Sequence, residues 1–247
     1  MAQNLNVAAW LFCGTIAIST IFESRAALAY TIDATNCQTA IEVNDIDVSR
    51  QYQQGLAAAA AGDLAQAMAS FDRAIALDPQ YFPAYIERGN VKDGIGDFDG
   101  AAADYTIAIS LKPRSVAAYY NRGTVLSKSG NHQAALADYN IAIGLDPQYA
   151  PAYMNRGNEL DDLGNSAEAI ASYNRALQLK PNYALAYLNR GIAYGRAGNR
   201  DRAIADFQVA ARLFKETGSL DRYERTLKLI KRMQSAVLWF NRSIPYN

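Results

Sequence analysis

A row of asparagines recurs along this chain at a step of 34 residues. Asn121, Asn155 and Asn189 occupy one place in the row, and Asn90 and Asn158 occupy a second place three residues beyond the first. A side-chain amide both donates and accepts hydrogen bonds, so a regular row of amides can bind the backbone of an extended peptide whatever its side chains are. These five residues therefore predict a peptide-binding groove. The alternative is that the amides are polar surface groups or bond one helix to the next.

An apolar row accompanies the asparagines at the same step, one residue before the first place. Its members are Ile86, Tyr120, Met154 and Leu188. Apolar side chains beside a row of amides favour a peptide or loop that is bound by backbone hydrogen bonds and hydrophobic contacts together. Charged residues near these rows carry both signs, so the sequence does not determine the sign of the ligand's charge. They are Lys128 and Arg196 against Asp93, Asp161 and Asp162.

Catalytic and metal-binding chemistry find little support in the sequence. His132 is the single histidine, and it follows Asn131 without a cysteine or second histidine that could complete a metal site. Neither a glycine-rich phosphate loop nor a serine nucleophile elbow occurs. The formal net charge of +0 supplies no general field for nucleic acid or anionic lipid. We expect no enzyme activity, no cofactor, no metal and no nucleic-acid partner.

The elements that must position these rows repeat with the same period. Prolines at 79, 113, 147 and 181 mark it, and residues 48–217 divide into the units 48–81, 82–115, 116–149, 150–183 and 184–217. When each unit is numbered from one, position 8 is always glycine, positions 20 and 27 are alanine, and position 24 is phenylalanine or tyrosine. Such a pattern indicates a stacked helical solenoid. A fainter 68-residue period, DPQY at 78–81 and at 146–149, indicates that a pair of units was duplicated.

These repeats resemble the tetratricopeptide repeat (TPR) family. The resemblance implies an all-α fold: a right-handed superhelical solenoid of five TPR helix-turn-helix units plus a C-terminal capping helix. We expect the first helix of each unit near positions 2–14 and the second near positions 18–31. A glycine followed by Asp or Asn lies between them, where it ends one helix and caps the next. The proline at position 32 stops the second helix.

In TPR superhelices the first helices line the concave surface, so the resemblance places the asparagine row in that groove. The row is similar to the asparagine ladder of the enzyme that attaches N-acetylglucosamine to proteins, whose catalytic domain has no counterpart here. Another TPR class binds the C-terminal carboxylate of chaperones with lysines at positions 2 and 5. This chain has no lysine at those positions, so that function is not expected.

Arginine occupies position 7 in four units, and aspartate occupies position 23 in three of them. The arginines could form an anion-binding row, but the two positions can face each other within a hairpin, and we expect ion pairs. The pairs are Arg88–Asp104, Arg122–Asp138 and Arg190–Asp206. As exposed pairs they would contribute about 0–1 kcal/mol each. Arg156 faces Ser172 instead, and the pattern singles it out for another role.

The N-terminal segment indicates export or anchoring. Residues 7–22 carry no charge and precede Ala27-Leu28-Ala29, a small-x-small pattern typical of cleavage sites. This apolar run is shorter than the roughly 20 residues that a spanning helix needs. We expect residues 1–29 to be a signal peptide or an uncleaved N-terminal membrane anchor, and residues 30–47 to be a linker arm. Cleavage would leave Cys37 as the only cysteine, either a solvent-facing thiol or a link between chains.

A further helix is predicted over residues 218–240, with a tail over 241–247. Apolar residues at helical spacing would cover the last repeat and cap the array against solvent. These residues are Leu220, Tyr223, Leu227, Ile230 and Val237. The run from Ala236 to Phe240 is more apolar than a cap requires. It either packs back on the array or presents a surface for self-association or a partner.

Together these observations predict a non-enzymatic TPR scaffold or assembly factor, exported to a periplasm, a lumen or the medium. It would bind a partner protein or an extended peptide in its concave groove. The alternative is a membrane-tethered, self-associating module of an envelope or photosynthetic-membrane complex. Contact with the membrane would then run only through the uncleaved N-terminal segment, and self-association through the C-terminal helix.

Overall fold

The computed structural model describes residues 47–242, with side chains as far as Ser235. Every regular element in this part of the chain is an α-helix, which confirms the all-α fold. The chain forms two compact units, Met1–Ala84 and Tyr85–Asn247. The signal or anchor predicted over 1–29, almost all of the linker arm over 30–47 with Cys37, and residues 243–247 lie outside the described residues.

The first compact unit contains a helical hairpin. One helix covers residues 47–60, and α3 spans Leu64–Leu77. Phe71 of α3 is fully buried, and its ring lies so close to Gly55 that a Cβ there would overlap the ring. The ring of Tyr52 lies 6.0 Å from that of Phe71 and 5.4 Å from that of Tyr81. An aromatic cluster therefore joins the two helices.

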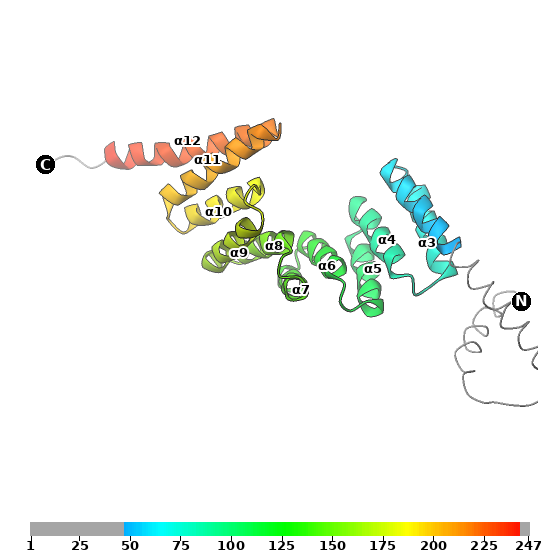
Figure 1. Cartoon of the computed structure of the whole chain (residues 1–247). Coiled ribbons are helices and arrows are strands. Elements are labelled where there is room, and N and C mark those ends of the chain that lie inside the picture. The colour runs from blue at the N-terminus through cyan, green and yellow to red at the C-terminus, as the bar shows by residue number, and fades with distance from the viewer. Residues whose placement is uncertain (1–46, 243–247) are drawn as a thin grey trace, which may run out of the picture. The chain divides into compact units, whose positions relative to one another are not determined.

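The second compact unit is also built of helix pairs (Figure 1). Its helices are α4 (Phe82–Gly94), which begins at the end of the first unit, α5 (Phe98–Leu111), α6 (Val116–Lys128), α7 (His132–Leu145), α8 (Ala150–Asp162), α9 (Ser166–Leu179), α10 (Ala184–Arg196), α11 (Arg200–Glu216) and α12 (Leu220–Arg242). Consecutive helices pack on each other from α5 to α12, and α8 also contacts both α6 and α10. The first helices of successive repeats are thus neighbours. Each of α4 to α10 begins and ends one residue earlier than the repeat pattern predicted.

The turns inside the repeats follow from glycine, and those of the first three repeats also from polar caps. Gly130 has φ of 79°, a left-handed conformation that ends α6 at little steric cost. The side chain of Asn131 then accepts a hydrogen bond from the backbone N–H of Ala134, at the start of α7. Asp63 and Asp97 cap α3 and α5 in the same way. The chain therefore reverses at the places that the sequence pattern marks.

The prediction that the polar residue caps the next helix was wrong for Asn165 and Asn199, whose side chains form no capping hydrogen bond at the start of α9 and α11.

A ring at position 24 packs on the glycine at position 8 in every repeat. A Cβ added at Gly123 would lie 2.9 Å from Cε1 of Tyr139 and 3.3 Å from the backbone oxygen of Ala135. Real Cβ atoms do not approach that closely, so only glycine fits. The corresponding pairs of the second unit are Gly89–Tyr105, Gly157–Tyr173 and Gly191–Phe207. This contact sets the distance between the two helices of a repeat.

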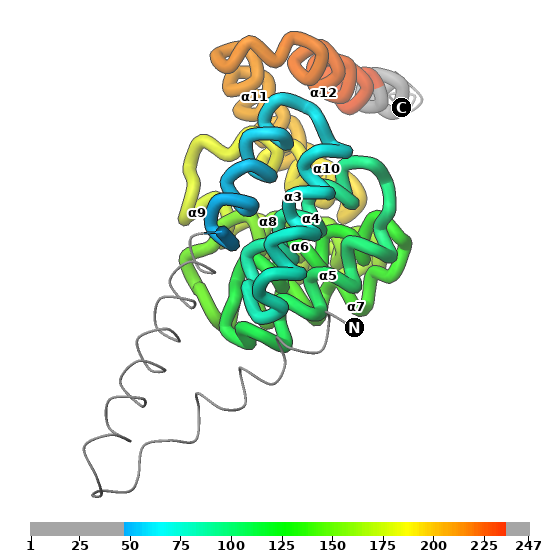
Figure 2. Tube along the Cα trace, turned by 90° about the vertical axis from the view of Figure 1, so that its right-hand side faces the viewer, coloured from blue at the N-terminus to red at the C-terminus, as the bar shows by residue number. Residues whose placement is uncertain are grey.

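The C-terminal helix α12 packs on α11 (Figure 2). Its buried residues differ from the predicted ones. Leu220 and Leu227 are 62% and 42% exposed, so the prediction that they cover the last repeat was wrong. Thr226 is fully buried instead, and its hydroxyl donates to the backbone oxygen of Arg222 at 2.7 Å. A small side chain whose polar group is satisfied within its own helix can face the array closely. Val237 and the run to Phe240 lie beyond the described side chains.

Among residues 47–242, no helix combines the length and the apolar character that crossing a membrane requires.

We expect Gly123→Val to lower the free energy of unfolding by about 1–3 kcal/mol, because the added side chain must displace the ring of Tyr139. Gly144→Ala is the matched control. Gly144 also lies in a helix of this repeat, but no atom lies within 4 Å of an added Cβ. Helix propensity should therefore make that change stabilising by up to about 1 kcal/mol. Urea unfolding measures both variants, and equal stabilities would contradict the close ring–glycine contact.

Candidate functional site

The predicted asparagines lie on the first helices of the second unit, where they bond one helix to the next. Asn121 on α6 donates from Nδ2 to Oδ1 of Asn90 on α4 at 3.0 Å. Asn189 on α10 donates from Nδ2 to Oδ1 of Asn158 on α8 at 2.7 Å. The structure therefore brings four of the five predicted asparagines together as two equivalent pairs.

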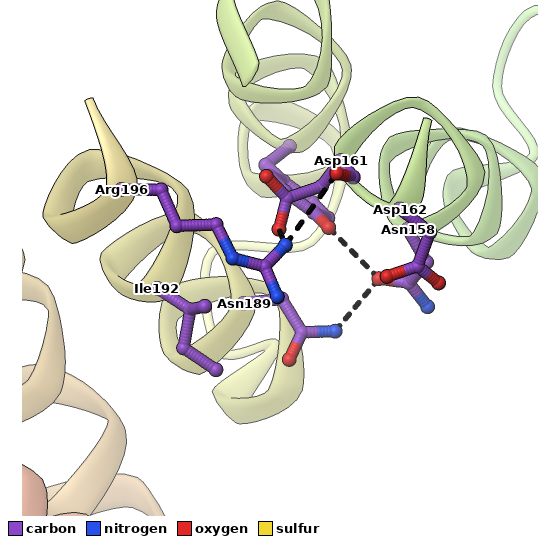
Figure 3. A pocket seen from close by; sticks show the side chains of 7 residues that line it. Asn158, Asp161, Asp162, Asn189, Ile192 and Arg196 are labelled. Carbon is purple, nitrogen blue, oxygen red and sulfur yellow. Dashed lines mark hydrogen bonds and ion pairs between the residues drawn. The ribbon is translucent and has the colours of Figure 1, made fainter. Parts of the chain in front are cut away.

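The second-place asparagines, Asn90 and Asn158, have fully used amide oxygens. The hydroxyl of Tyr105 donates to Oδ1 of Asn90 at 2.8 Å, and that of Tyr173 donates to Oδ1 of Asn158 at 2.9 Å. An amide oxygen has two lone pairs, and the neighbouring asparagine supplies the second donor. In Figure 3 the amide nitrogen of Asn189 faces Asn158. These two oxygens serve the contact between repeats.

The junction between α6 and α8 is built differently, because position 9 is Thr124 there. The hydroxyl of Tyr139 donates to Oγ1 of Thr124 at 3.4 Å. Asn155 on α8 donates from Nδ2 to the hydroxyls of Tyr120 at 3.2 Å and Tyr139 at 3.5 Å. The bonding thus alternates: amide meets amide at the α4–α6 and α8–α10 junctions, and amide meets hydroxyl at the α6–α8 junction.

The first-place asparagines, Asn121, Asn155 and Asn189, retain an unused acceptor. Their bonds to neighbouring repeats all run through Nδ2, and no described residue donates to their Oδ1 atoms. All three side chains are half-buried, so a ligand can reach them from solvent. The backbone N–H of an extended peptide is a donor that such an oxygen accepts. We call these three oxygens the acceptor row.

A cleft of about 240 Å³ lies beside the Asn158–Asn189 pair. It is lined by Asn158, Asp161, Asp162, Tyr173, Asn189, Ile192 and Arg196, which come from α8, α9 and α10 (Figure 3). Arg196 forms an ion pair with Asp161. Asp162 is exposed and forms no ion pair within the described part of the chain. The cleft therefore combines amide groups, an apolar side chain and one unbalanced carboxylate.

The charged residues that flank the asparagines pair across repeats. Nζ of Lys128 lies 2.6 Å from Oδ1 of Asp93, which joins α6 to α4. Arg196 and Asp161 join α10 to α8 in the same way. Both cations are therefore balanced by an acid of the preceding repeat. The mixed charge that the sequence predicts is present, but most of it is neutralised internally.

His132 lies at the α6–α8 junction and contacts a buried acid. Its Nδ1 lies 2.8 Å from Oε2 of Glu159, and Oγ of Ser127 donates to Oε1 of the same carboxylate at 2.6 Å. Glu159 is 2% exposed. The serine donates to the carboxylate and not to the imidazole, which is not the arrangement that activates a serine nucleophile. Residues 47–242 hold no group of three side chains placed to bind a metal ion.

One member of the predicted apolar row is buried, and the other three are half-buried. Met154 is 8% exposed and belongs to a core cluster with Leu177. Ile86 and Leu188 are half-buried. The ring of Tyr120 is also half-buried; it packs on those of neighbouring tyrosines, and its burial raises the pKa of its hydroxyl. The row therefore contributes first to packing, and its half-buried members border the acceptor row.

The 68-residue period reappears in the bonding of the site. The matched residues are Asn90 and Asn158, Asp93 and Asp161, Tyr105 and Tyr173, Asn121 and Asn189, and Lys128 and Arg196. Sequence reasoning missed the tyrosine hydroxyls as partners of the asparagines, and it missed the pairing of each cation with an acid. The faint two-unit period is the signal that could have found both.

The ion pairs predicted between positions 7 and 23 are confirmed. Nε and Nη2 of Arg122 each donate to Asp138 at 2.8 Å, and its Nη1 donates to Oγ1 of Thr106 in the preceding repeat at 3.2 Å. The pairs Arg88–Asp104 and Arg190–Asp206 have the same two-pronged geometry. The expectation that these pairs are exposed was wrong. The three aspartate side chains are only 2%, 5% and 8% exposed, because the helices of each repeat cover them.

The sequence matches tetratricopeptide repeat families along most of its length. Residues 38–82 and 86–150 match one family described as tetratricopeptide repeat, and residues 185–217 match another with the same description. Residues 157–198 match a family described as TPR repeat. No curated protein matches the chain.

Several solved structures are similar to this chain. A crystal structure of MamA is 26% identical with a TM-score of 0.62, over 70% of this chain and 94% of that chain. YrrB, described as a TPR protein with an unusual peptide-binding site, is 26% identical with a TM-score of 0.59, over 71% of this chain and 91% of that chain. PilF of Pseudomonas aeruginosa shares the fold at 18% identity and a TM-score of 0.63, over 77% of this chain and 93% of that chain.

We expect Asp138→Ala to lower the free energy of unfolding by about 3–5 kcal/mol, because Arg122 would keep a partly buried charge without its carboxylate. Glu216→Ala is the control: it removes a solvent-exposed pair with Arg212 and should cost less than about 1 kcal/mol. Urea unfolding at neutral pH measures both. A cost for Asp138→Ala as small as that for Glu216→Ala would show that the buried pairs do not stabilise the repeats.

Proposed function

Because this chain belongs to the tetratricopeptide repeat family, we propose that it is a scaffold that binds an extended segment of a partner protein. The segment would lie across α6, α8 and α10. Its backbone N–H groups would donate to the acceptor row of Asn121, Asn155 and Asn189. No catalytic residue, cofactor or metal is needed for this function.

The observation that carries the proposal is one unused amide oxygen per repeat on three successive first helices. Packed helices lie roughly 8–10 Å apart. A peptide in the polyproline II conformation rises about 3.1 Å per residue with three residues per turn, so it presents equivalent groups about every 9 Å. The two spacings agree, and we infer that every third residue of the segment donates its N–H to one asparagine.

The cleft at the α8–α10 junction supplies a place for one side chain of that segment. Because Asp161 balances the charge of Arg196 and Asp162 has no such partner in the described chain, the cleft carries a net negative charge. We infer that it accepts a lysine or arginine side chain, whose aliphatic stem would contact Ile192. The likeness to YrrB, a TPR protein described by its peptide-binding site, supports a peptide ligand.

We also propose that the protein acts outside the cytoplasm. The uncharged residues 7–22 and the small residues at Ala27 and Ala29 support export. The second candidate is a tethered, self-associating module, and it is favoured by Leu220 and Leu227. These two exposed leucines lie seven residues apart and thus on one face of α12. The intact mass and the sedimentation of the protein from its own cells separate the candidates. Loss of residues 1–29 from a monomer supports export, and an uncleaved oligomer supports tethering.

We expect a photo-crosslinking residue in place of Ile192 to capture the partner segment, because Ile192 lines the cleft beside Asn189. The same residue in place of Ile141, which is 42% exposed on the second helix α7, is the matched control. Mass spectrometry of the product identifies the cross-linked segment. Equal capture from both positions would move the binding surface away from the first helices.

Substitutions in the acceptor row complete that experiment. Asn121→Ala, Asn155→Ala and Asn189→Ala together should abolish capture from position 192. Asn140→Ala with Asn174→Ala is the control, because it also removes bonds between repeats, those from Arg156 and Arg190, each worth about 1.5–3 kcal/mol, but lies on the second helices and leaves the acceptor row in place. Circular dichroism verifies that both variants are folded. If the triple variant captures the partner segment as well as the natural chain does, the acceptor row is not part of the binding site.

A further inference from the structure

The fourth repeat, 150–183, interrupts the row of buried ion pairs at Arg156. Its Nε donates to Oγ of Ser172 at 3.1 Å, where the other arginines meet an aspartate. Its Nη1 donates to Oδ1 of Asn140 at 3.3 Å, as Arg190 donates to Asn174. The guanidinium is therefore positioned like its counterparts. Its Nη2 forms no hydrogen bond to a described residue, whereas in the other repeats this atom meets the carboxylate.

Ser172 cannot replace the missing carboxylate. It is fully buried, and its hydroxyl donates its proton to the backbone oxygen of Glu168 at 3.0 Å. It thus offers Arg156 one neutral oxygen, where an aspartate offers two charged ones. Burial lowers the pKa of Arg156, whereas the hydrogen bonds to Asp138 raise the pKa of Arg122. A partly buried cation that has no directly bound carboxylate gains from binding one.

A second arginine lies beside the same ring as Arg156. The Cζ atoms of Arg156 and Arg175 lie 5.3 Å and 6.0 Å from the ring centroid of Tyr153. Arg175 hydrogen-bonds only to the neutral side chain of Gln178, at 3.2 Å, within the described chain. Glu168 acts on Arg156 through space but forms no ion pair with it. Both guanidinium groups therefore lie within about 6 Å of one ring centroid, and neither forms an ion pair among the described residues.

We propose that Arg156 and Arg175 form a binding site for one carboxylate-sized anion. The anion would occupy the place that an aspartate side chain fills in the neighbouring repeats. A guanidinium presents parallel N–H donors that match the two oxygens of a carboxylate. The carboxylate comes either from a small free anion or from an Asp or Glu side chain of a partner protein. This site is separate from the acceptor row and does not depend on peptide binding there.

Binding of ¹³C-formate to the full chain, followed by NMR at constant ionic strength, tests the site. We expect one saturable site in the natural chain and at least about tenfold weaker binding after Arg156→Gln or Ser172→Asp. Ser172→Asp also restores the internal pair and should raise the melting temperature by about 2–4 °C, which shows that this variant folds. Equal formate binding by the natural chain and Ser172→Asp, or no saturable binding by the natural chain, would overturn the proposal.

Glu168→Gln tests whether this neighbouring acid occupies the site in place of an external anion. If the natural chain binds formate and Glu168→Gln binds it equally or more strongly, the proposal is supported. Formate binding that appears only in Glu168→Gln means that Glu168 already fills the place, and this result overturns it.

Two further measurements on the full chain separate the sources of the carboxylate. A partner's side chain is the source if both formate and Ser172→Asp reduce capture of the partner. A free anion is the source if formate raises the melting temperature and leaves capture unchanged. Each of these outcomes supports the anion site.

Discussion

The packing of an aromatic ring on a glycine is the contact on which the rest of this structure depends. In the second repeat the missing Cβ of Gly89 admits the ring of Tyr105 between the two helices. The ring then places its hydroxyl 2.8 Å from Asn90, whose oxygen also accepts from Asn121 of the next repeat. A steric contact within one repeat thus sets the hydrogen bonds between repeats.

The last repeat lacks the two side-chain groups that form these hydrogen bonds. Phe207 replaces the tyrosine there and Ile192 replaces the position-9 asparagine, so this repeat has neither the hydroxyl nor the amide of the α4–α6 and α8–α10 junctions. The next described element is α12, which lacks the pattern of a first helix. The amide and hydroxyl bonds therefore join α4, α6, α8 and α10. They use the amide oxygens of Asn90 and Asn158, whereas those of the acceptor row keep no donor among the described residues.

Several charges at the contacts between helices are compensated by a neighbouring residue of opposite sign. Buried aspartates neutralise three arginines within their repeats, and Asp93 and Asp161 neutralise cations of the following repeats. Against this background, an unbalanced charge is informative. Asp162 in the cleft and Arg156 beside Ser172 are two such charges, and we assign a ligand of opposite sign to each.

Much of the fold was determined by the sequence itself, because its signals are local. Gly130 and Asn131 end one helix and begin the next through their own backbone and side-chain preferences, and the 16-residue spacing of Arg122 and Asp138 brings them together in any such hairpin.

The roles of the asparagines were decided only by the tertiary structure. Asn90 and Asn121 are the same residue type, yet their amide oxygens differ. That of Asn90 accepts hydrogen bonds from Tyr105 and from Asn121, whereas that of Asn121 has no donor among the described residues. The orientation of α12, with Thr226 buried and Leu227 exposed, was likewise decided only by tertiary contacts, those with α11 and with Gly195 of α10. An apolar pattern leaves the rotation of a single helix open until a neighbour packs against it.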